Sequence, residues 1–160
     1  RATAKFHHRP HGLAALPRRP GYLYVRPHAA HTHPSTRRSL AMPDLNPVFN
    51  ELKSIMAPYA KTLDPKKDDE SELYLDTKHI QKNKKPLFFG AVQLKKSFVS
   101  FHLMPVYLKP ELLDGISPEL KAHMQGKSCF NFKEVDKLMF KQLAALTKAG
   151  FASYKEQGFV

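Results

Sequence analysis

Tryptophan is absent from this chain of 160 residues, and cysteine occurs once, at Cys129. A single cysteine excludes an internal disulfide and gives no sign of an oxidising compartment, so we expect a cytoplasmic protein. No apolar run approaches the roughly 18 residues that span a bilayer, so no membrane partner is expected. The 11 phenylalanines and six tyrosines are ample for the core of a small domain.

Acidic residues are missing from residues 1–41, which hold eight lysines and arginines, five prolines and six of the nine histidines. Proline at this density breaks helices, and the scattered apolar residues do not offset the entropy of ordering the chain. We therefore expect a disordered, basic head. Residues 42–160 carry 18 basic and 14 acidic residues, so the strong positive charge belongs to the head. This second part is expected to form one domain.

Three interpretations of the head stay open. The chain starts with Arg1 and its composition changes at Met42, so Met42 can be the true start and the head a stretch outside the native protein. An arginine-rich, acid-free segment is also typical of a mitochondrial presequence, although the prolines oppose the amphipathic helix that such a segment needs. A third interpretation is a metal-binding tail in which His7, His8 and His11 share an ion.

A predicted β-hairpin organises the rest of the chain. Two apolar runs, 87–94 and 98–103, flank the segment 95–97, which holds two lysines and is short enough for only a tight turn. Every second residue from Val99 to Leu103 is apolar. Because side chains alternate between the faces of a strand, one face of this hairpin is expected to lie on a core.

The remaining patterns predict helices that cover this face and strands that extend the sheet. Asn46-Pro47 favours a helix start, and Gly126 and Gly150 favour helix ends. In chain order we expect a helix from Asn46 to about Pro58, a charged loop at 64–70, a strand at 72–77, the hairpin, a short helix at 117–125, a strand at 128–132 and a helix at 133–148. This order indicates an α+β fold, an antiparallel sheet of about four strands with helices packed on one face.

Three motifs carry a resemblance to a known family: Gly90 in the first hairpin strand, the lysine turn at 95–96, and Gly126-Lys127-Ser128 before the fourth strand. With the order of elements, they resemble the YdhG-like family of small bacterial proteins over roughly residues 44–157. The resemblance implies an α+β fold with an antiparallel sheet and helices on one side. Some relatives are described as frataxin-like iron chaperones, which implies iron binding through an acidic surface.

Alternation along the predicted strands divides their residues between two faces. The helix-facing set is apolar and consists of Leu73, Leu75, Val92, Leu94, Val99, Phe101, Leu103, Phe130 and Phe132. The opposite set is aromatic, polar and ionisable, which is typical of a ligand or partner surface. Its candidate binding residues are Tyr74, Asp76, Phe89, Gln93, Ser100, His102, Cys129 and Asn131. In the alternative interpretation, the aromatic residues of this face pack against the crossover at 106–116.

Three other patterns give weaker indications of a function. Cys129 and His102 on adjacent strands could form a nucleophile and its base, but no orienting acid is identified, so no catalytic residue is predicted. Gly126-Lys127-Ser128 lacks the earlier glycine of a phosphate-binding loop, since position 121 is a lysine. Lysines between positions 78 and 96 could contact phosphates, but few aromatic residues accompany them for base stacking.

We therefore expect a small non-enzymatic binding module without a cofactor. It would use the sheet face around His102 to hold an unknown small molecule or protein partner, including a second copy of itself. The alternative function is frataxin-like iron delivery, with iron held by the acidic loop, and a weak nucleic-acid binder is the second alternative. The acidic loop consists of Asp68, Asp69, Glu70 and Glu72.

Overall fold

The computed structural model describes residues 44–160, so the predicted head at 1–41 lies outside the described residues. Six strands form one antiparallel sheet in the order β1-β2-β3-β4-β6-β5. The strands are β1 (Asp64–Asp68), β2 (Glu72–Ile80), β3 (Pro86–Leu94), β4 (Val99–Leu103), β5 (Met124–Gln125) and β6 (Cys129–Phe132). The α+β prediction is confirmed, and the sheet has two short strands more than the four expected.

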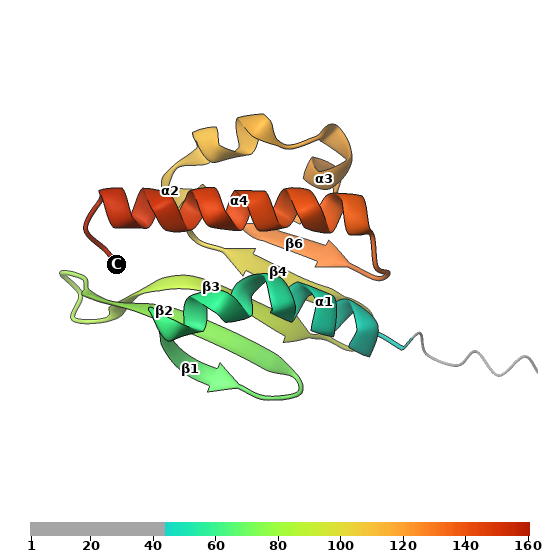
Figure 1. The fold of residues 1–160 in the computed structure, drawn as a ribbon, viewed down its shortest axis with the longest axis horizontal. Helices are drawn as coiled ribbons and strands as arrows, with labels where there is room; N and C mark the ends of the chain where they lie inside the picture. Colours follow the sequence, from blue (N-terminus) through green and yellow to red (C-terminus); the bar gives the residue numbers. More distant parts are fainter. Residues whose placement is uncertain (1–43) are drawn as a thin grey trace, which may run out of the picture. The chain divides into compact units, whose positions relative to one another are not determined.

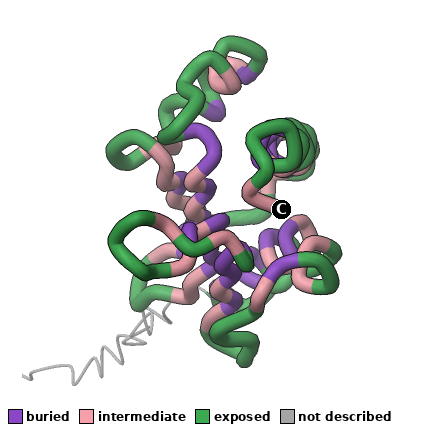
Figure 2. The backbone as a smooth tube through the Cα atoms, turned by 90° about the vertical axis from the view of Figure 1, so that its left-hand side faces the viewer, coloured by how far each residue is buried: buried purple, intermediate pink, exposed green. Residues whose placement is uncertain are grey.

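Two long helices cover one face of the sheet (Figure 1). The helical elements are α1 (Asn46–Met56), η1 (Ala57–Lys61), α2 (Pro105–Leu108), η2 (Pro110–Gly115), α3 (Pro118–Ala122) and α4 (Lys137–Glu156). Figure 2, in which α1 and α4 are seen end-on, shows both helices on the same side of the strands. Within residues 44–160, no helix is long and apolar enough to cross a membrane.

The central hairpin forms as predicted. The Lys95 backbone N–H donates to the Phe98 carbonyl at 2.9 Å and closes the turn between β3 and β4. The register places Val92, Phe101 and Phe130 side by side on β3, β4 and β6. All three are fully buried beneath the helices, so this row forms the centre of the core.

A bulge in β3 changes the face of one predicted site residue. Leu75 pairs with Gly90 and Asp76 pairs with Phe88, so Phe89 is an extra residue that interrupts the alternation. The Phe89 side chain is fully buried, and its ring lies 5.7 Å from the ring of Tyr154 on α4. The prediction that Phe89 belongs to the opposite face is therefore wrong. Phe88 takes that place.

Two expected boundaries are also wrong. The last helix begins at Lys137, where the Asp136 carboxylate accepts from the Met139 N–H, and it continues through Gly150 to Glu156. Gly150 does not end the helix. It allows close packing, because a Cβ atom there would lie 2.9 Å from the Pro105 Cβ.

The segment 64–70, expected to be a charged loop, contributes strand β1 at the edge of the sheet. The helix expected at 117–125 is shorter, since α3 spans Pro118–Ala122 and Met124–Gln125 pairs with β6 as β5. The crossover from α2 to α3 packs against α4 and not across the opposite face of the sheet.

Candidate binding face of the sheet

The face of the sheet away from α1 and α4 brings together the predicted site residues except Phe89. We call this surface the open face, and it consists of Tyr74, Asp76, Phe88, Ala91, Gln93, Ser100, His102, Cys129 and Asn131. One cross-strand row runs from Tyr74 through Ala91 and His102 to Cys129. The next row contains Glu72, Gln93, Ser100 and Asn131, and the Gln93 amide donates to the Glu72 carboxylate. Alternation places these side chains opposite the helix-facing core.

Four polar side chains of the open face form one hydrogen-bonded cluster. The Ser100 hydroxyl lies 2.8 Å from His102 Nε2 and 3.1 Å from Cys129 Sγ. Cys129 Sγ is also 3.5 Å from both His102 Nε2 and Asn131 Oδ1. Because these groups satisfy one another across β4 and β6, their side chains are held in place without a ligand.

The His102 imidazole is held in its neutral form. Burial lowers its pKa below the ordinary value of 6.5, and the positive charge of Lys95 lowers it further. At neutral pH the ring is therefore uncharged, and either nitrogen can be the acceptor. A neutral imidazole can be covered by a partner at much lower cost than an imidazolium.

The cluster lacks the third group that a catalytic thiol site needs. In residues 44–160 the hydrogen bonds of His102 run from Nε2 to Ser100 and Cys129, and no carboxylate bonds the ring. A base that activates a nucleophile is normally oriented by such a group.

Aromatic side chains border the cluster on β2 and β3. The rings of Tyr74 and Phe88 stack with centroids 4.7 Å apart. Ala91 separates this pair from His102, and its small side chain is almost fully buried between its neighbours. Nearby Asp76 is 7% exposed; burial raises its pKa, Lys66 opposes this shift, and Asp64 adds to it.

The described part of the chain has, among its hollows, five of about 280 to 600 Å³, and no residue of the open face lines any of these five. An enclosed site for a small molecule normally buries most of the surface of its ligand.

The carboxylates of the acidic loop pair with neighbouring lysines and with backbone N–H groups. Lys53 pairs with Asp68, and Lys67 pairs with both Asp69 and Glu72. Asp69 Oδ1 accepts from the backbone N–H and hydroxyl of Ser71, which lowers the Asp69 pKa to about 2. No three His, Cys, Asp or Glu side chains among residues 44–160 lie close enough to hold a metal ion. The loop is therefore arranged as a charged turn.

Removing these acids is expected to leave iron binding unchanged and near background. The test is anaerobic titration calorimetry with ferrous ion on the wild type and on the Asp68→Asn, Asp69→Asn, Glu70→Gln variant. A matched control removes three acids elsewhere, Glu111→Gln, Asp114→Asn and Glu156→Gln. Micromolar ferrous binding that disappears only in the loop variant would support iron delivery.

The chain was compared with protein-family models, with curated proteins and with solved structures. Nothing matches. The resemblance to the YdhG-like family therefore stays a prediction from the sequence motifs.

Proposed function

We propose that this chain is a non-enzymatic binding module whose open face holds a protein surface. The observation that carries the proposal is the row from Tyr74 to Cys129, whose four side chains are uncharged on a helix-free face, with the charged pair of Lys67 and Glu72 at its border. A solvated sheet face normally alternates polar and charged residues against the core. The centres of protein interfaces are poor in charge and rich in aromatic side chains, as this row is.

The internal hydrogen bonds of the cluster lower the cost of covering it. Burying an unpaired polar group costs about 1–3 kcal/mol. Here Ser100, His102 and Cys129 already pair with one another, so a partner need not supply every hydrogen bond. The Tyr74–Phe88 stack adds apolar area beside the cluster.

The dimensions of the face suit a small interface. The open face lies on four strands about 4.8 Å apart, so it is roughly 14 Å wide, about half the side of the patch of about 800 Å² that a stable interface buries per partner. The uncharged row and the aromatic stack beside it support a protein surface over a small molecule. A second copy of the chain is the simplest such partner, because a twofold pair would place the same row on both sides.

A lysine in the middle of the face is expected to abolish partner binding. Ala91 is the centre of the row and is almost fully buried by its neighbours in the chain itself, so the lysine of Ala91→Lys has to extend above them and places a charge where an interface excludes it. Ala145→Lys, at an exposed position of α4, is the control for the added charge, although it does not match the burial of Ala91. Native mass spectrometry of protein purified from its own host reports the bound mass for each variant, and thermal unfolding checks that both fold.

The proposal expects a bound protein or second copy in the wild type and in Ala145→Lys, and its loss in Ala91→Lys. A bare monomer in the wild type at every concentration would contradict it. An added mass of a few hundred daltons that Ala91→Lys removes would show that the face takes a small molecule, and the protein-partner assignment would be wrong.

A further inference from the structure

A second surface, away from the open face, has the form of a small-molecule site. A groove of about 600 Å³ lies between the crossover and the turn from β5 to β6, and it is the largest of the five hollows. Its walls include Val106, Tyr107, Leu113 and Met124. Volumes of 300 to 1,000 Å³ with mainly apolar walls and few polar groups are typical of ligand sites.

The walls come from elements that leave apolar side chains uncovered. Val106 is buried at the base of the groove, and Leu113 and Met124 are partly buried. The Tyr107 side chain remains 46% exposed. A ligand with an apolar body would remove this surface from water, which is the main favourable contribution to such binding.

One charged side chain lines the groove, and it is a cation. Lys127 follows Gly126, whose φ of +75° forms the turn between β5 and β6. Its ammonium lies 5.5 Å from the centre of the Tyr107 ring, in a cation–π contact that holds the charge at the groove. No carboxylate lines the groove, and within residues 44–160 Lys127 forms none of the ion pairs.

We propose that this groove binds an amphiphilic carboxylate, with its apolar body against Leu113 and Met124 and its carboxylate on Lys127. Charge complementarity decides the class of ligand, because the groove offers a single cation beside apolar walls. An ammonium next to apolar surface pairs with a carboxylate more strongly than one in open water. The site is independent of the open face and does not require the proposed protein partner.

The test uses decanoate and its uncharged counterpart decanol as probes of the full chain. Binding is measured by displacement of 1-anilinonaphthalene-8-sulfonate, whose fluorescence rises in an apolar site and falls when a probe displaces the dye. We expect decanoate to bind about tenfold more tightly than decanol, the ratio that one charge-assisted contact supplies. Amide chemical-shift changes at Gly126 and Lys127 would place the probe in the groove.

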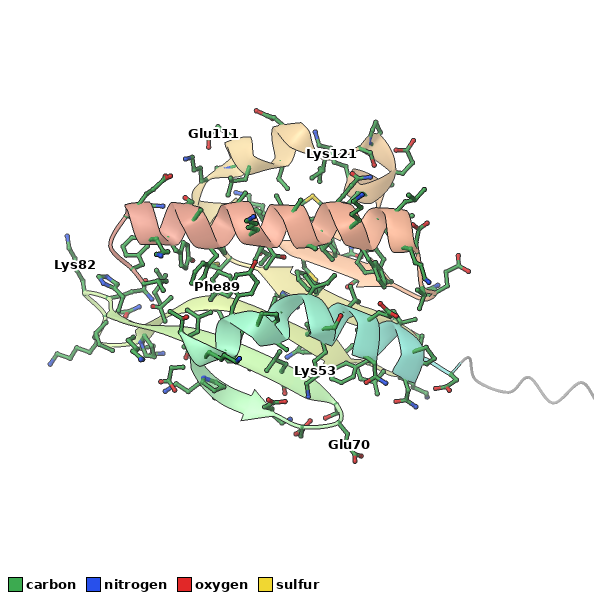
Figure 3. All side chains as sticks on the ribbon, viewed as in Figure 1. Lys53, Glu70, Lys82, Phe89, Glu111 and Lys121 are labelled. Atoms are coloured by element: carbon green, nitrogen blue, oxygen red, sulfur yellow. The ribbon has the colours of Figure 1, made fainter. Side chains whose placement is uncertain are left out.

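Two variants separate the charge from the apolar wall. Lys127→Gln is expected to weaken decanoate about tenfold and leave decanol unchanged. Tyr107→Ser is expected to weaken both probes, because it removes shared apolar surface. Lys121→Gln is the matched control: this lysine lies on α3 (Figure 3). It is exposed and does not line the groove. Thermal unfolding confirms that each variant is folded.

Equal affinity for decanoate and decanol, or an unchanged decanoate affinity in Lys127→Gln, would overturn the proposal. So would the absence of saturable binding by either probe. If a peptide ending in a leucine carboxylate displaced the dye 100-fold better than decanoate, the groove would belong to a peptide chain terminus and not to a small carboxylate.

Discussion

Phe101→Ala is expected to reduce the free energy of unfolding by about 3–5 kcal/mol, which approaches the whole stability of a small domain. Phe101 is fully buried in the central strand β4 and pairs with Val92 on one side and Phe130 on the other. Truncating its ring leaves a cavity that the helices above cannot fill. Urea denaturation followed by circular dichroism measures the loss.

His102→Ala, one residue along, is the matched change on the opposite face. We expect it to cost about 1 kcal/mol or less, because Ser100 keeps its contact with Cys129 when the imidazole is gone. It should instead weaken binding of the partner to the open face. If His102→Ala lowers the free energy of unfolding as much as Phe101→Ala does, then His102 is a structural residue and is not the centre of a binding surface.

Phe89→Ala is expected to destabilise the protein by about 3–5 kcal/mol, whereas Phe88→Ala should cost about 1 kcal/mol. The bulge turns Phe89 into the core, where its ring packs on Tyr59, Phe151 and Tyr154. Phe88 is only half-buried and stacks on Tyr74 at the surface. The pair differs by one position along β3, so each variant controls for the other.

Urea denaturation measures the free energy of unfolding of both variants. A large loss for Phe88→Ala and a small one for Phe89→Ala would mean that β3 keeps regular alternation in solution. Reduced partner binding in Phe88→Ala, with stability retained, would show in addition that the aromatic stack belongs to the working surface.

The bulge at Phe89 could not be predicted from the sequence pattern of β3. Alternation is a local rule, and it holds along β4 and β6, so the cluster of Ser100, His102, Cys129 and Asn131 follows from the sequence. Phe89 departs from the rule because residues distant in sequence form an aromatic site for its ring. The Tyr154 hydroxyl, 66 positions away, also donates to the Phe88 carbonyl at 3.0 Å. The residues of β3 by themselves give no indication of these partners.

The predictions for Gly150 and for the charged segment 64–68 were wrong because both depend on contacts with other parts of the chain. Glycine is typical of a helix end, but the close approach of Pro105 explains why Gly150 lies within α4. The segment 64–68 is charged like a loop, yet it pairs with β2 as an edge strand. The groove at Lys127 was not predicted, because its walls come from three short elements that carry little periodicity of their own.

The two edges of the sheet limit how copies of this chain can associate. Strand β1 presents Asp64, Lys66, Lys67 and Asp68 together with Pro65, and its pairing with β2 is irregular between Pro65 and Lys67. Strand β5, at the other edge, is only two residues long. Charge, proline, irregular pairing and short length each oppose the addition of a further strand. Growth into filaments through the edges is therefore blocked, and association through the open face, being face to face, would end at a closed pair.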